Sequence, residues 1–87
     1  MQSKSVVVTS QIGLQARHAT AFTQKANEYN SNIWLEYANQ RTNAKSLLAV
    51  GALAIACGAK IEIIADGPDE AQAVEGLAEL VDSAFKA

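Results

Sequence analysis

The sequence predicts an α/β domain of the α+β kind, with three helices on one side of a four-stranded sheet. Segments typical of strands and helices follow one another in the order βαββαβα. Each predicted helix carries one apolar stripe and each predicted strand one apolar face, a pattern typical of two packed layers. The 87 residues contain no linker, repeat or low-complexity tract, so residues 1–87 are expected to form a single domain.

The first predicted elements are a strand and a helix. The β-branched run Lys4–Thr9 predicts the strand, and the glycine-containing segment Ser10–Gly13 predicts a turn. From about Arg17 to Asn27, apolar residues recur at helical spacing, namely Ala19, Phe22 and Ala26. The segment Tyr29–Asn32 is rich in residues that favour turns and is expected to end this helix.

A hairpin and a short helix are predicted next. Ile33–Tyr37 alternates as a half-buried strand does, and a turn over Ala38–Arg41 leads to a short third strand that ends near Asn43. Ser46 then precedes a run with helical period, formed by Leu47, Leu48, Val50, Leu53 and Ala54. Because serine is a favoured N-cap, Ser46 is expected to begin this helix, and Gly58 is expected to stop it.

The last predicted elements are a strand and a long helix. Ile61–Ala65 predicts the fourth strand, and Asp66–Asp69 is a strong turn signal. The helix is expected over about residues 69–85, with an apolar stripe formed by Val74, Leu77, Ala78, Val81 and Phe85. Asp69 and Glu70 in its first turn complement the helix dipole.

Alternation along the strands assigns their side chains to two faces of the sheet. The residues expected to face the helices are Val6, Val8, Ile33, Leu35, Ile61 and Ile63. Those expected on the open face are Val7, Trp34, Glu36, Glu62 and Ile64. On that face Val7, Trp34 and Ile64 could form a small exposed apolar patch.

Composition and charge exclude several function classes. A net charge of −2, with seven scattered Lys and Arg residues, argues against a nucleic-acid-binding surface. No apolar run approaches the roughly 20 residues that cross a bilayer, and the N-terminus lacks the apolar stretch of a signal peptide. The single cysteine, Cys57, excludes an internal disulfide. A cytoplasmic location without membrane or direct nucleic-acid partners is expected.

His18 and Ser46 are the residues that could carry chemistry, and each has two readings. His18 lies in the first turn of a predicted helix, where an anion is favoured, so it is either a phosphoryl or anion site or a surface residue without a role. The adjacent Arg17 could bind phosphate or carboxylate. Ser46 is either a cap alone or also a place for phosphate, which the neighbouring Lys45 would make tolerable.

The sequence contains no further catalytic or cofactor motif. It has no phosphate-binding loop, no Gly-x-Gly-x-x-Gly and no isolated pair of carboxylates. His18 is the only histidine, which argues against a metal cluster. We therefore expect a protein that is not an enzyme and that needs neither cofactor nor metal.

Two segments resemble the HPr family, the phosphocarriers of the bacterial sugar phosphotransferase system. Gly13–Thr20, with the sequence GLQARHAT, resembles the active-site segment, and Asn43–Leu53 resembles the regulatory serine segment. The resemblance continues through Gly58–Ile61 and Ala65–Gly67 and covers essentially the whole chain. It implies an open-faced β-sandwich of four antiparallel strands and three helices, which agrees with the two layers predicted above.

The first segment departs from the family pattern at two positions. Gln15 stands where the family has its phosphoryl-accepting histidine, and His18 stands where the family has a proline. An amide has no basic lone pair that could accept a phosphoryl group, whereas a neutral imidazole has one. The chain is therefore most similar to the Crh-type regulatory paralogues, which lack that histidine, and the usual carrier chemistry is not expected.

The Crh-type resemblance implies a role for each site residue. Ser46 would be phosphorylated by HPr kinase/phosphorylase, and the phosphoserine form would act as corepressor of a LacI-type catabolite control regulator. The residues expected to take part in binding partners are Gln15, Arg17, His18, Lys45, Leu47 and Leu48. Two alternatives stay open: a phosphocarrier that uses His18, and a diverged binding module that acts through the Trp34 patch. The oligomeric state stays open as well.

Overall fold

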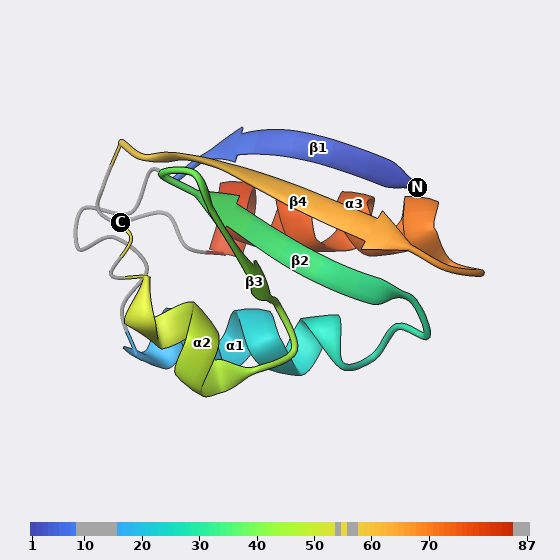
Figure 1. The fold of residues 1–87 in the computed structure, drawn as a ribbon, viewed down its shortest axis with the longest axis horizontal. Coiled ribbons are helices and arrows are strands. Elements are labelled where there is room, and N and C mark those ends of the chain that lie inside the picture. The colour runs from blue at the N-terminus through green and yellow to red at the C-terminus, as the bar shows by residue number, and fades with distance from the viewer. Residues whose placement is uncertain (9–15, 54, 56–57, 85–87) are drawn as a thin grey trace.

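A computed structural model describes residues 1–8, 16–53, 55 and 58–84 of the chain. Its elements follow the predicted order βαββαβα, with a π-helical segment, η1, at the end (Figure 1). Their bounds are β1 Gln2–Val7, α1 Ala16–Ala26, β2 Asn32–Tyr37, β3 Gln40–Asn43, α2 Leu47–Ala52, β4 Lys60–Asp66, α3 Glu70–Glu79 and η1 Leu80–Ala84. No helix among these residues is long and apolar enough to span a membrane.

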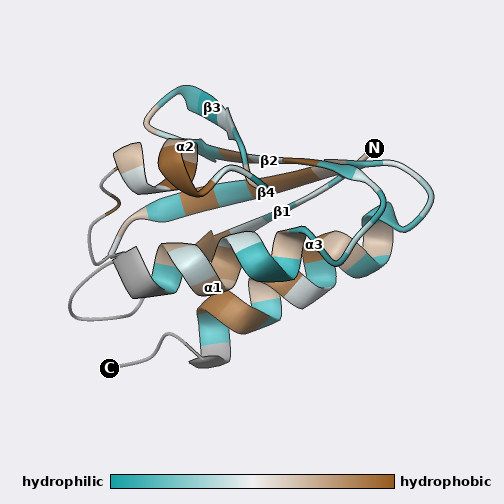
Figure 2. Ribbon diagram, turned by 90° about the horizontal axis from the view of Figure 1, so that it is seen from below, coloured by the Kyte–Doolittle hydropathy of each residue, from teal (hydrophilic) through white to brown (hydrophobic). Residues whose placement is uncertain are grey.

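The four strands form one antiparallel sheet in the order β1-β4-β2-β3. Helices α1 and α3 lie side by side on one side of the sheet (Figure 2), and α2 packs against α1 and β3. The fold class and the two-layer arrangement predicted from the sequence are therefore confirmed. Strand β1 is an edge strand, so its pairing with β4 is the only sheet contact among the described strands that holds the chain's first residues.

The core lies between the sheet and the helices, and the predicted inner face is confirmed. Five of the six strand residues assigned to that face are at most 2% exposed, namely Val8, Ile33, Leu35, Ile61 and Ile63, while Val6 is partly buried. The helices contribute Phe22 and Leu77, which are fully buried. The larger share of the apolar stripe predicted for the last helix is also buried, namely Val74, Leu77, Ala78 and Val81.

The predicted apolar patch on the open face does not form as expected. Ile64 faces the open side but is only 3% exposed. Trp34 lies directly opposite it on β2, and Ser3 lies opposite it on β1, so cross-strand neighbours are placed to cover Ile64. Val7 is 48% exposed and pairs with Lys60, four residues along β4 from Ile64. The prediction of this patch was wrong because it did not consider the packing between neighbouring strands on that face.

Helix α2 is shorter than its apolar pattern predicts. It ends at Ala52 with Leu53 as C-cap, and Gly58 does not stop it. Gly58 has a φ of +85°, and its N–H donates to the carbonyl of Val8 at 2.7 Å, while the Val8 N–H donates to the carbonyl of Ala59 at 2.9 Å. Gly58 is thus the turn residue that leads into the β1–β4 pairing, a role that glycine suits at positive φ.

The start of α3 is held by a tertiary contact that the sequence pattern did not indicate. Asp69 occupies the N-cap position, yet its side chain makes no hydrogen bond to its own helix. Its carboxylate accepts hydrogen bonds from the Ser31 hydroxyl at 2.5 Å and from the Asn30 N–H at 2.9 Å. These donors stabilise the charged form, so they hold the pKa of Asp69 below its usual value. Glu70 lies in the first turn as predicted.

Candidate functional site

Ser46 begins α2 as the sequence predicts. Its backbone is extended, with φ −102° and ψ 112°, and its Oγ accepts a hydrogen bond from the Ala49 N–H at 3.3 Å. Its carbonyl accepts the first helical bond, from the Val50 N–H at 3.0 Å. This is the geometry of a serine N-cap, in which the hydroxyl satisfies one of the free amides of the first turn. Ser46 is half-buried.

An apolar surface adjoins the Ser46 hydroxyl. Leu47 is 46% exposed and Leu48 is 87% exposed, whereas Val50 carries the buried contact of α2 with the core. A depression of about 420 Å³ lies here, lined by Ala19, Thr20, Leu47, Leu48, Gly51 and Ala52. Thr20 and Gly51 in that lining were not predicted, because their place depends on the packing of α1 against α2.

Lys45 is joined to the end of α1. Its ammonium donates to the carbonyl of Tyr29 at 2.8 Å. The side-chain amide of Asn27 donates to the Lys45 carbonyl at 3.2 Å and to the Thr23 carbonyl at 2.8 Å. Sequence reasoning missed Asn27, since nothing local to it points to a residue 18 positions away.

His18 and Thr20 point to different sides of α1. His18 is the third residue of α1 and half-buried. At about 100° per residue it is displaced by about 200° from Thr20, which faces α2. Lys25, on the same side of α1 as His18, lies beside Gly76 of α3. His18 therefore points away from the side of α1 on which Thr20 lines the depression beside Leu47 and Leu48.

The other site residues of the first segment are only partly described. Arg17 is the second residue of α1, and its side chain lies outside the described part of the structure. Gln15 lies outside the described residues, as do Cys57 and Phe85 of the predicted last helix. The expected roles of Gln15 and Arg17 in binding partners stay predictions.

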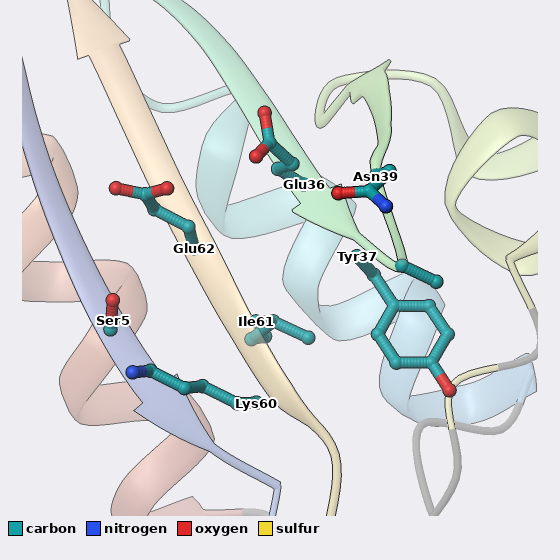
Figure 3. A pocket seen from close by; sticks show the side chains of 8 residues that line it. Ser5, Glu36, Tyr37, Asn39, Lys60, Ile61 and Glu62 are labelled. Atoms are coloured by element: carbon teal, nitrogen blue, oxygen red, sulfur yellow. The ribbon is translucent and has the colours of Figure 1, made fainter.

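A polar hollow occupies the open face of the sheet, formed mainly by Ser5, Glu36, Asn39, Lys60 and Glu62 (Figure 3). Glu36 and Glu62 lie directly opposite each other on β2 and β4, a placement in which like charges repel. The guanidinium of Arg41, bonded to Glu36 at 3.1 Å, offsets that repulsion. The described residues contain no group of three or more metal-ligating side chains.

Comparison with known proteins agrees with this arrangement. The family model described as "PTS HPr component phosphorylation site" matches residues 2–83. The phosphocarrier protein HPr of Neisseria meningitidis serogroup A is 36% identical over 85 residues, which are 98% of this chain and 96% of the relative. The HPr-like protein Crh of Bacillus subtilis is 41% identical over 81 residues, which are 93% of this chain and 95% of Crh.

A solved structure extends the similarity to three dimensions. The crystal structure of HPr-C-His from Thermoanaerobacter tengcongensis superposes with a TM-score of 0.93 at 34% identity, covering 98% of this chain and 96% of that one. Sequence and structure thus agree over nearly the full length of both proteins, and the relatives include HPr and Crh. This chain belongs to the HPr family of the phosphotransferase system.

Proposed function

We propose that this protein is a regulatory member of the HPr family that works through phosphorylation of Ser46. HPr kinase/phosphorylase adds the phosphate, and the phosphoserine form is the corepressor of a LacI-type catabolite control regulator in the cytoplasm. The observation that carries this proposal is the half-buried Ser46, which caps the start of α2 and is followed by the exposed Leu47 and Leu48.

The residue at position 15 supports a regulatory role rather than a carrier role. Gln15 stands where the family's carriers have their phosphoryl-accepting histidine. An amide nitrogen has no basic lone pair, so it cannot accept the group that an imidazole accepts. Ser46 then remains as the phosphate acceptor that matches a family motif.

A phosphate on Ser46 is compatible with the fold. It adds about −1.5 to −2 charges and three acceptor oxygens at the N-terminus of a helix, where negative charge is favoured. The Ala49 N–H, which donates to the hydroxyl, is placed to donate to a phosphate oxygen instead. The modification therefore changes the charge of the surface and leaves the packing of α2 in place.

The apolar neighbours of Ser46 supply the rest of the partner surface. Leu48 is 87% exposed, and covering such an apolar side chain with a partner makes binding more favourable. A regulator with a cation for the phosphate and an apolar pocket for Leu48 would bind the modified form in preference to the unmodified one. Gln15 and Arg17 at the start of α1 are proposed to border this surface, and the expected part of His18 in binding partners stays a prediction.

Phosphorylation can be tested directly by intact mass. The wild-type chain, Ser46→Ala and the matched control Ser3→Ala are incubated with an HPr kinase/phosphorylase and ATP. Wild type and Ser3→Ala should each gain the mass of one phosphate, and Ser46→Ala should gain none. An unmodified wild type, or a phosphate that persists in Ser46→Ala, contradicts the proposal.

The absence of carrier activity needs a separate assay. The chain is incubated with phosphoenolpyruvate and enzyme I under conditions that label an ordinary HPr, and no acid-labile phosphate is expected. A label that disappears in His18→Gln would show instead that the chain is a carrier that uses His18.

A further inference from the structure

The backbone N–H, the carbonyl and the ammonium of Lys45 each make a hydrogen bond within the protein. Its N–H donates to the Asn43 side-chain oxygen at 3.0 Å, its carbonyl accepts from the Asn27 amide at 3.2 Å, and its ammonium donates to the Tyr29 carbonyl at 2.8 Å. The two contacts to the end of α1, those with Asn27 and Tyr29, form what we call the Asn27–Lys45 clamp.

The ammonium has an electrostatic reason to lie where it does. Backbone bonds from Glu28 to Lys25 and from Tyr29 to Ala26 continue the last turn of α1. Carbonyls at the end of a helix lack helical partners and carry the negative end of its dipole, which favours a cation. The Tyr29 carbonyl thus binds Lys45 in the way a C-terminal carbonyl binds a capping lysine.

The clamp fixes the residue that directly precedes Ser46. Ala44, on the other side of Lys45, is fully buried, and its N–H donates to the Ile33 carbonyl at 2.9 Å. The backbone that leads into Ser46 is therefore held by the sheet at Ala44 and by α1 at Lys45.

We infer that Lys45 is a positioning residue for the Ser46 hydroxyl, which it places by tying the start of α2 to the end of α1. This inference rests on the proposed phosphorylation of Ser46 and deepens it. It differs from the expectation that Lys45 itself binds partners or supports the phosphate, because the bond to Tyr29 directs its ammonium toward the end of α1. Asn27, an uncharged residue, contributes to the same positioning through the Asn27–Lys45 clamp.

The first test needs no kinase. Hydrogen exchange at the Ala49 amide, measured by NMR, reports how often the Ser46 cap is formed, because that amide donates to the Ser46 hydroxyl. Lys45→Met and Asn27→Ala should each accelerate this exchange. The control Lys60→Met removes the same charge from the open face of the sheet and should leave it unchanged, and Lys45→Arg, which keeps a donor for Tyr29, should stay close to wild type.

The second test separates positioning from direct contact with the kinase. Loss of orientation at the reacting hydroxyl should lower kcat by about 10- to 100-fold in both Lys45→Met and Asn27→Ala, with KM nearly unchanged because Leu47 and Leu48 are intact. The double variant should fall by less than the product of the two single effects, since both break one clamp. Lys45→Arg should recover most of the lost kcat.

The two tests distinguish positioning by Lys45 from direct binding of a partner by Lys45. A raised KM in Lys45→Met, with normal exchange at Ala49 and a neutral Asn27→Ala, would overturn the inference and assign Lys45 to partner binding. If the wild type is not phosphorylated, the proposed function fails and the exchange measurement alone decides the clamp. If Lys45→Met does not fold, Asn27→Ala and Lys45→Arg decide through the same exchange measurement.

Discussion

The starts of α2 and α3 carry residues of the same capping class, Ser46 and Asp69, and use them in different ways. The Ser46 hydroxyl bonds the Ala49 amide three residues ahead in its own helix. The Asp69 carboxylate bonds Ser31 and Asn30, 38 and 39 residues away, and makes no side-chain bond to its own helix. One side chain is a local cap, and the other joins two distant segments.

This difference separates a modifiable position from a structural one. The hydroxyl of Ser46 accepts a local bond from the Ala49 amide, a bond that a phosphate oxygen can accept instead. The carboxylate of Asp69 holds the loop between α1 and β2 against the start of α3, so altering it disturbs two segments at once. A capping residue in the sequence therefore marks a candidate phosphorylation site at the start of α2, and a structural junction with the α1–β2 loop at the start of α3.

The largest effect on stability is expected from Gly67→Ala, next to the α3 junction. A Cβ at this position would lie 2.6 Å from both Cα and Oγ of Ser31. The backbone of Ser31 must then move, and with it the contact to Asp69, so we expect a loss of about 1–3 kcal/mol in the free energy of unfolding. Urea denaturation followed by circular dichroism measures it. A free energy of unfolding equal to that of the wild type would show that the backbone around Ser31 is loosely packed against Gly67.

A smaller effect is expected from Ser46→Ala, which removes the cap of α2. Loss of the bond to the Ala49 amide should cost about 1 kcal/mol. Ser46→Asp keeps a capping oxygen and should restore most of this stability. The two variants are compared in one denaturation series, and an unchanged Ser46→Ala together with a destabilised Ser46→Asp would contradict the cap.

A gain of about 0.5–1 kcal/mol is expected from Gly51→Ala within α2. Alanine is the better helix former, and a Cβ at Gly51 would meet no atom within 4 Å. This variant is the counterpart of Gly67→Ala, since the same substitution should stabilise one region and destabilise the other. A loss of thermal stability in Gly51→Ala would show that α2 is more tightly enclosed than the open depression beside it implies.

The smallest effect concerns acid pH and a single carboxyl. The Ser31 hydroxyl and the Asn30 N–H hold the pKa of Asp69 below its usual value, so the contribution of Asp69 to stability is present above the unfolded pKa and is lost as the pH falls through the lower folded pKa. Ser31→Ala removes the stronger donor and should raise the pKa of Asp69 toward its ordinary value. An NMR titration measures the change. Ser46→Ala is the control and should leave that pKa where it is in the wild type.

Much of the fold could be predicted because its signals are local. Strands and helices followed from period-two and helical spacing of apolar residues, and the cap at Ser46 needs only the amide of Ala49, one turn away. The extent of α2 could not be predicted in this way. Its apolar pattern runs on to Ala54, but the helix ends at Ala52, and Gly58 is drawn into pairing with Val8 at the end of β1.

In the candidate site, too, some features follow from the local sequence and others from tertiary packing. The sequence by itself determined that Ser46 starts a helix, that Leu47 and Leu48 follow it, and that glutamine occupies position 15. Only the tertiary structure decided that the ammonium of Lys45 binds the carbonyl of Tyr29, that Asn27 completes this clamp, and that Ile64 is covered on the open face. The physical reason is range: propensity and capping act within one turn of the chain, whereas these contacts exist only after α1, α2 and the sheet have packed together.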